Sequence, residues 1–171
     1  LCPTTNFLGE DIYKSDYALN EQEIEIRLTH YFNPYHNKIN ALLKDFKSKF
    51  NKALFWDAHS IRRHVPSIHD NPFPDFIIGD NDSTSCDIKF TKITKNELLK
   101  SGLQVNFNHP FKGGYLTRSK GNPSQHIHAI QLEMCKDLYM NHSETKYDKK
   151  KAVEIKKILK NTFQYLIESL I

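Results

Sequence analysis

The chain has 171 residues, of which 39% are apolar and 26% charged, so it can fold as one domain with a buried core and is too apolar for wholesale disorder. Much of its formal net charge of +4 lies in the run KYDKKKAVEIKK (146–157), which is typical of the solvated face of a helix and does not indicate nucleic-acid binding. No apolar run approaches the ~18 residues of a membrane span.

The three cysteines, Cys2, Cys86 and Cys135, are odd in number, far apart and without a CxxC pair. This usage argues against a disulfide framework or a structural zinc site, and it favours a reducing, cytoplasmic compartment. The chain starts at leucine and shows no export signal, and the missing initiator methionine indicates a fragment or a processed piece.

The first third of the chain is expected to be a loop followed by helix. Residues 1–19 have no sustained period, whereas apolar residues recur at helical spacing from Ile24 to Phe50. Asn20 is suited to cap this helix, and Pro34 predicts a kink or a junction of two helices near Asn33.

The rest of the chain alternates between strand and helix patterns, which favours a single α/β domain over 1–171 with helices on the faces of a sheet. Strands are predicted at 53–57, 75–80, 103–107 and 126–134, with a loop after Asp57. Helices are predicted from Thr94, in a capping box with Glu97, to Gly102, and from Asp148 onward. The glycine- and proline-rich stretch 108–123 predicts a functional loop with a short strand at GYLTR (114–118).

Polar side chains follow the first predicted strand, which is where open α/β proteins usually place their chemistry. Asp57 and His59 come directly after ALFW, and a metal, a substrate anion or a structural hydrogen-bonded pair could each explain His59. Arg62 and Arg63 are most simply read as exposed. Cys86 is interpreted as buried rather than nucleophilic, because no cationic motif lies near it.

The strand 126–134 carries an unusual carboxylate. Alternation places Gln131 and Glu133 on one face and His126 and His128 on the other. Glu133 is a candidate general acid and base, and the alternative is a structural carboxylate bonded to a helix N-terminus or a lysine. The two histidines could chelate a metal or simply be partly exposed.

Two arginines could hold a carboxylate through paired N–H donors. Arg27 lies in the first predicted helix and Arg118 in the glycine-rich stretch. A surface ion pair is the alternative for each of them.

Several stretches together resemble the N-formylglutamate amidohydrolase family. They are EIRLTHYFNPYH (25–36), DAHS (57–60), PDFIIGD with TSCD (74–87), and NHPFKGGYLTRSKGNPSQHIHAIQLEMCKDLYM (108–140). The resemblance implies a zinc-dependent hydrolase related to zinc carboxypeptidases and aspartoacylases, with a mixed sheet flanked by helices. Such enzymes release formate from N-formyl-L-glutamate, a small N-acyl amino acid, in histidine breakdown.

Carried over to this sequence, the resemblance assigns roles to single residues. His59 would be a zinc ligand, and Glu133 would deprotonate the attacking water and then protonate the leaving amine. Arg118 and Arg27 would hold substrate carboxylates, and His128 is the member of the HxH pair expected nearer the pocket. Further donors around the substrate would come from Ser60, Gly113 and Gly114.

The sequence also departs from the family pattern, because no PHxG segment with a following acidic residue precedes the match. That segment would supply the first metal ligands and the opening strands of the sheet. We therefore expect this chain to be the C-terminal portion of a longer amidohydrolase. The alternative is a truncated, non-catalytic homologue that binds a small carboxylate or a protein. The unusual turn at 79–87 and the basic stretch after DAHS leave room for an acyl amino acid other than N-formylglutamate.

Overall fold

The computed structural model describes residues 2–6, 8–14, 16–17 and 19–171. From residue 76 onward strands and helices alternate, as the sequence pattern predicts, whereas β1 and β2 follow each other without a helix. In chain order the elements are α1 (Glu21–Arg27), a π-helical turn (Leu28–Phe32), α2 (Asn33–Phe50), β1 (Ala53–Ile61), β2 (Phe76–Gly79), α3 (Ile88–Leu99), β3 (Val105–Phe107), α4 (Tyr115–Lys120), a 3-10 turn (Pro123–Gln125), β4 (Ile127–Cys135), a second 3-10 turn (Lys136–Leu138) and α5 (Lys149–Leu170).

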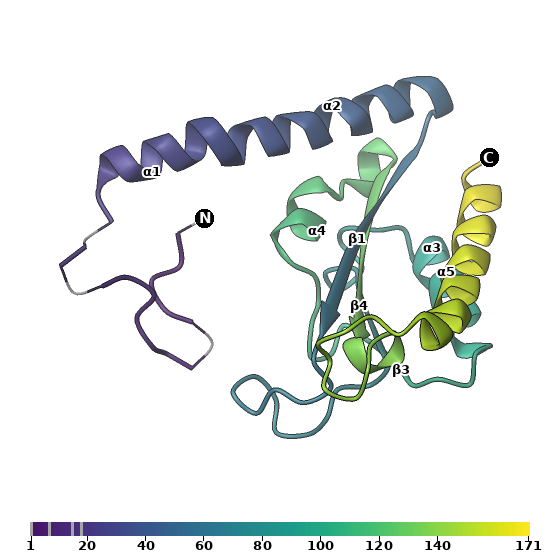
Figure 1. Ribbon diagram of the computed structural model, residues 1–171. Helices are drawn as coiled ribbons and strands as arrows, with labels where there is room; N and C mark the ends of the chain where they lie inside the picture. Colours follow the sequence, from purple (N-terminus) through teal and green to yellow (C-terminus); the bar gives the residue numbers. More distant parts are fainter. Residues whose placement is uncertain (1, 7, 15, 18) are drawn as a thin grey trace.

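The four strands form one sheet in the order β1-β4-β2-β3. β1 runs parallel to β4, β2 runs antiparallel to β4, and β3 runs parallel to β2. α3 and α5 pack together on one side of the sheet, and α4 lies against β1 and β4 on the other (Figure 1). The predicted mixed sheet with flanking helices is therefore confirmed.

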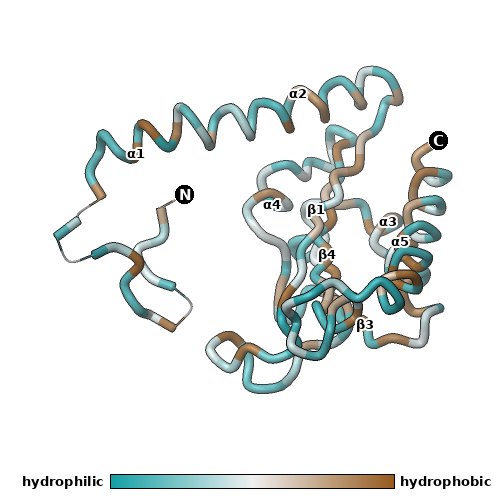
Figure 2. Tube along the Cα trace, in the orientation of Figure 1, coloured by the Kyte–Doolittle hydropathy of each residue, from teal (hydrophilic) through white to brown (hydrophobic). Residues whose placement is uncertain are grey.

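The main core lies between the sheet and the α3–α5 pair. Apolar residues concentrate along the central strands, whereas the first long helix alternates between apolar and polar residues (Figure 2). A second, smaller cluster lies under the loop that follows β1, around Phe73, Ile77 and Cys135. The buried members of the main core are Phe76, Ile78, Cys86, Phe90, Leu98, Ile130, Leu132, Ile155 and Leu166.

The first helix projects away from the sheet as one long rod (Figure 1). Asn20 caps it as predicted, because its side-chain oxygen accepts a 2.8 Å hydrogen bond from the backbone N–H of Glu23. The predicted interruption falls just before Pro34, where a π-helical turn separates α1 from α2 and Asn33 N–H bonds to Leu28 O. The turn changes the hydrogen-bonding pattern while the helix continues. None of the helices that the structure describes has an apolar stretch of the length that a bilayer crossing needs.

Three predicted boundaries are wrong. β1 continues to Ile61, so the predicted loop after Asp57 is strand for four more residues. α3 begins at Ile88 with Asp87 as its cap, whereas Thr94 lies inside it and donates to the carbonyl of Phe90. The stretch predicted as a strand at GYLTR forms α4 instead.

The sequence suggested that Arg63 is exposed, and the structure shows that this prediction is wrong. Its guanidinium is half-buried and contacts Asp75 at 2.6 Å, Asp137 at 2.8 Å and the carbonyl of Phe73 at 2.9 Å. Because these partners lie on both sides of the loop after β1, Arg63 holds that loop against the end of β4. Arg62 is exposed and pairs with a glutamate at the surface.

Asp80 is the most completely satisfied buried carboxylate and joins three segments. It follows β2, is fully buried, and accepts hydrogen bonds from Asn108 Nδ2 (2.8 Å), Ser83 N–H (2.7 Å) and Thr91 Oγ1 (2.8 Å). Its own N–H donates to Asn108 Oδ1. The turn after β2, the helix α3 and the start of the glycine-rich stretch are thereby tied to one side chain.

We expect Asp80→Ala to lower the free energy of unfolding by about 3 kcal/mol, because it leaves three donors without their acceptor, among them the buried hydroxyl of Thr91. Urea unfolding followed by circular dichroism measures this change. Asp82→Ala is the matched control in the same turn, since its exposed ion pair with Lys112 contributes only about 0–1 kcal/mol. Equal losses in the two variants would contradict the role assigned to Asp80.

Candidate functional site

The parallel register of β1 and β4 brings the two principal predicted residues together. His59 is paired with Glu133, and Asp57 is paired with Gln131, two residues earlier on each strand. Paired residues of adjacent strands point to the same face of a sheet. The four side chains therefore form a polar square on the face opposite the main core, at the carboxyl end of β1.

A cavity of about 340 Å³ opens over this square. The loop between β3 and α4 forms one wall of the cavity, so segments far apart in the sequence line the same space. Its lining residues are His59, Pro110, Phe111, Lys112, Gly113, Gly114, Arg118, Gln131 and Glu133.

Glu133 combines burial with an unused oxygen. Its side chain is only 11% exposed, and its Oε2 has no hydrogen-bond partner among the described residues. Burial raises the pKa of this carboxyl group; His59 opposes the shift, and Asp57 adds to it. A carboxyl group of this kind can exchange a proton with a molecule in the cavity.

Asp57 connects His59 to the helix α4. The His59 ring nitrogen Nε2 lies 3.1 Å from Asp57 Oδ1, and Thr117 Oγ1 donates to Asp57 Oδ2 at 2.9 Å. Because a carboxylate only accepts, the His59 ring donates from Nε2 to Asp57 and directs Nδ1 toward the cavity. Nδ1 lies 3.7 Å from Glu133 Oε1, at the edge of the cavity.

The wall of the cavity depends on two glycines. Gly79 in β2 has no side chain, and a Cβ there would lie 2.7 Å from the carbonyl carbon of Lys112. Gly113 adopts a φ of 128°, and a Cβ on it would lie 2.9 Å from Thr117 Cγ2. The main chain of the loop therefore lies directly on β2 and on α4.

Gly114, the next residue of the cavity wall, is held by the side chain of Gln131. Gly114 donates its N–H to Gln131 Oε1 at 2.5 Å, which fixes the entry to α4. Arg118 lies one turn into that helix and donates from Nη1 to the carbonyl of Gly113 at 2.5 Å. Its side chain is exposed at the mouth of the cavity, and its other N–H groups can donate to further partners.

Two predicted substrate-binding residues do not reach this cavity. Arg27 projects from the long helix and donates to Glu23 (2.9 Å) and to the hydroxyl of Tyr13 (2.7 Å). Ser60 lies on the other face of β1, where its hydroxyl accepts from Tyr139 at 2.8 Å. The predicted site residues that line the cavity are His59, Glu133, Arg118, Gly113 and Gly114. Arg27 and Ser60 are not among them.

His128 also lies away from the cavity, so the expectation that it approaches the pocket is wrong. It is buried on the main-core face of β4, where its ring lies 4.6 Å from that of Phe90. Its Nδ1 accepts the backbone N–H of Asp87 at 3.2 Å. Burial lowers the pKa of this imidazole, as is usual for a neutral structural histidine.

The sequence interpretation missed Thr117 as part of the site. GYLTR was predicted as a strand, in which Thr117 has no fixed relation to Gly113, whereas a helix places residues four apart on one face. Gly113 and Gly114 directly precede the hexamer YLTRSK (115–120). A pair of glycines in this place could have indicated a loop that leads into a helix.

Comparison with known proteins gives consistent results. The sequence profile described as N-formylglutamate amidohydrolase matches residues 1–140. The N-formylglutamate deformylase of Pseudomonas putida is 36% identical over 169 residues, which cover 98% of this chain and 63% of the relative. The deformylase of Pseudomonas aeruginosa is 39% identical over 142 residues, covering 82% of this chain and 53% of the relative. The chain thus spans less than two thirds of the length of these curated relatives.

Two solved structures share the fold. The crystal structure of N-formylglutamate amidohydrolase from Ralstonia eutropha superposes with a TM-score of 0.78 at 24% identity, covering 90% of this chain and 56% of that one. A gene product of Agrobacterium tumefaciens gives a TM-score of 0.72 at 17% identity, covering 98% and 62%. At these identities the likeness establishes the fold alone.

We expect Thr117→Val to destabilise the protein by about 2 kcal/mol, because valine keeps the volume but leaves the buried oxygen of Asp57 without its donor. Thr117→Ser keeps the hydroxyl and is the matched control. The difference between the two midpoints of urea unfolding measures the hydrogen bond. Identical midpoints would show that Thr117 does not support Asp57.

Proposed function

The chain belongs to the N-formylglutamate amidohydrolase family, and from that premise we propose that it carries the general acid–base half of an enzyme that releases formate from N-formyl-L-glutamate. The observation that supports this proposal most directly is the pairing of His59 with Glu133 across β1 and β4, at the base of one cavity. The cavity volume of about 340 Å³ lies within the range of pockets for small molecules.

Glu133 is proposed as the group that moves the proton. Amide hydrolysis needs a base that takes a proton from the attacking water and an acid that delivers it to the departing nitrogen. The unpartnered Oε2 of Glu133 can do both in turn, because the raised pKa of its carboxyl group makes it easier to protonate than an ordinary glutamate. The formyl carbon leaves as formate, and the nitrogen leaves as the amino group of glutamate.

Arg118 is proposed to hold a carboxylate of the substrate. Its hydrogen bond to the carbonyl of Gly113 fixes the guanidinium beside the cavity, and the remaining N–H groups match the geometry of a carboxylate. Phe111 and Pro110 line the same wall and give it an apolar surface. The substrate would thus lie with its acidic end at Arg118 and its amide at Glu133.

Zinc is the cofactor that the family resemblance implies, and the residues of this chain do not by themselves fit a zinc centre. The described residues contain no group of three His, Cys, Asp or Glu side chains that could hold a metal ion. His59 offers one free ring nitrogen, whereas a catalytic zinc ordinarily has three protein ligands. We propose that zinc binds only when ligands from outside this chain join His59, and the roles given above belong to the chain's own residues.

Two further proposals follow from the family. The first is that the fold is related to that of zinc carboxypeptidases and aspartoacylases, which the mixed sheet with flanking helices supports. The second is that the protein acts in the cytoplasm, in histidine breakdown. Three free cysteines, two of them buried, are compatible with a reducing compartment.

A non-catalytic module is the second candidate function. It is favoured by one observation, the incomplete metal centre among the described residues. Such a module would use Arg118 and the cavity to bind a small carboxylate or a protein segment, without any role for the proton exchange of Glu133.

The first test uses Glu133→Gln in a chimera in which this chain replaces the matching part of the P. putida deformylase. We expect the variant to lower kcat for formate release by about 10²- to 10⁴-fold, because an amide cannot accept and return the proton. Glu154→Gln, exposed on α5, is the control and keeps full activity. A chimera whose formate release is unchanged by Glu133→Gln, or one that never releases formate, would favour the non-catalytic module.

Arg118→Ala in the same chimera is expected to raise KM for N-formyl-L-glutamate by about tenfold or more while kcat changes little, because a lost binding contact acts on the bound states alike. Arg118→Lys should recover only part of the loss, since lysine cannot form the paired contact. Initial rates at varied substrate concentration separate the two constants. An unchanged KM would remove Arg118 from the binding site.

A further inference from the structure

Gln131 is a buried polar residue of the cavity to which the roles given above assign no contact with the substrate. It is only 4% exposed and lines the cavity beside Glu133. The two residues lie on one face of β4 because the side chains of a strand alternate. Since the residue is nearly enclosed, its amide group can reach only the cavity and the main chain around it.

The orientation of this amide group is fixed by the main chain. The N–H of Gly114 is a donor, so the side-chain atom 2.5 Å from it is the oxygen Oε1 and the other end of the amide is Nε2. Two enclosed polar side-chain atoms of the described residues have no partner, His36 Nδ1 and Glu133 Oε2. Nε2 of Gln131 is not one of them, and it bonds to no residue that the structure describes. Its N–H groups are therefore open to the cavity.

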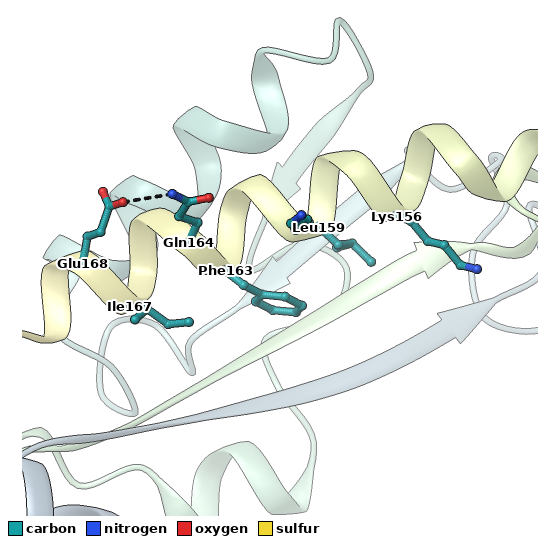
Figure 3. A pocket seen from close by; sticks show the side chains of 7 residues that line it. Lys156, Leu159, Phe163, Gln164, Ile167 and Glu168 are labelled. Atoms are coloured by element: carbon teal, nitrogen blue, oxygen red, sulfur yellow. Dashed lines mark hydrogen bonds between the residues drawn. The ribbon is translucent and has the colours of Figure 1, made fainter.

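A surface glutamine on α5 provides a contrast. Gln164 is exposed at the rim of a separate hollow of about 660 Å³, and its Nε2 donates to Glu168 Oε1 at 3.2 Å (Figure 3). Water can satisfy the rest of that amide. Because Gln131 is enclosed, its free donor depends on a molecule in the cavity.

One peptide group connects Gln131 to Arg118. The carbonyl of Gly113 accepts from Arg118 Nη1, and the N–H of the same peptide, on Gly114, donates to Gln131 Oε1. The C=O and N–H groups of a trans peptide point in opposite directions, so the two side chains lie on opposite sides of this peptide. Each of them keeps free N–H donors, and the peptide fixes the separation between them.

The contact between the peptide and Gln131 requires positions without side chains. Gly79 is the neighbour of Gln131 across β2 and β4, and a Cβ there would lie 2.7 Å from the carbonyl carbon of Lys112. A Cβ on Gly114 would lie 3.2 Å from Oε1 of Gln131. Since both residues are glycine, the main chain of the loop comes close enough to hold the amide.

Two separate groups of donors suit a ligand with two acidic groups. N-formyl-L-glutamate carries an α-carboxylate next to the amide that is cleaved and a second carboxylate at the end of its side chain. In an inference that rests on the function proposed above, we propose that Gln131 determines specificity by donating from Nε2 to the α-carboxylate, while Arg118 holds the distal carboxylate. A hydrogen bond to an ionised carboxylate is stronger than one between neutral groups.

The position of Gln131 favours the α-carboxylate over the formyl oxygen as its partner. Gln131 is tied to the same peptide as Arg118, at the end of the cavity assigned to the acid, whereas the scissile amide is assigned to Glu133. The two residues are also two positions apart on one strand, just as the α-carboxylate lies beside the amide. The substrate class that follows is N-acyl amino acids with a free α-carboxylate.

The test compares two substrates in the chimera described above. N-formyl-4-aminobutyrate lacks the α-carboxylate of N-formyl-L-glutamate and keeps the distal one. Gln131→Glu keeps an oxygen that accepts from Gly114 and replaces Nε2 by an oxygen that repels a carboxylate. We expect the ratio of kcat/KM for N-formyl-L-glutamate to that for N-formyl-4-aminobutyrate to fall by about tenfold or more. The ratio cancels any effect of the added charge on Glu133 that both substrates share.

Three further variants separate recognition from support of the loop. Gln131→Met is uncharged and of similar length, and it should lower the ratio in the same direction. Gln164→Glu makes the same chemical change on exposed α5, and Arg118→Ala removes the contact proposed for both substrates, so each should leave the ratio within about twofold. Equal losses on the two substrates in both Gln131 variants would overturn the proposal, because Gln131 would then act on the loop or on the formyl oxygen.

Calorimetric binding to this chain makes the test independent of turnover and of any variant's folding. We expect the chain to bind N-formyl-L-glutamate about tenfold or more tightly than N-formyl-4-aminobutyrate, and Gln131→Met to remove most of this difference. A chimera that releases no formate while the difference in binding holds would count against the enzyme function and retain the role of Gln131. Equal binding of the two compounds, or binding of neither, would overturn that role.

Discussion

The parallel pairing of β1 with β4 is the constraint on which the site depends. Its register sets His59 beside Glu133 and Asp57 beside Gln131, although 74 positions separate the members of each pair. The pairing also decides what lies behind the square, because the alternate residues of both strands enter the main core against α3 and α5. A shift of one residue would exchange the polar and apolar faces of a strand, so packing of the core and geometry of the site are fixed by the same hydrogen bonds.

Much of the fold could be predicted because hydrophobic periodicity is a local property. The long amphipathic helix after Asp148, the cap at Asn20 and the two faces of β4 follow from spacing alone, and the structure confirms them. The start of α3 could not be predicted in this way. Thr94 and Glu97 have the spacing of a capping box, but Asp87 takes the capping role because Thr91 and Thr94 turn inward and are satisfied by Asp80 and the carbonyl of Phe90.

The site was predictable in part, for a related reason. His59 and Glu133 could be singled out because polar residues at the end of buried strands are costly unless they are used or paired. The position of Arg27 could not be predicted from the sequence, since it depends on how the long helix projects from the sheet. Arg63 looked like its exposed neighbour Arg62, and only the fold of the following loop brings Asp75 and Asp137 to it.

The absence of a side chain at Gly79 affects how this protein can select its ligands. The main chain of the 110–114 loop rests directly on β2, with no flexible side chain between them to absorb movement. The cavity is therefore bounded by a main-chain wall on the Gly79 side, whereas its mouth is lined by the exposed side chain of Arg118, which is held to the carbonyl of Gly113.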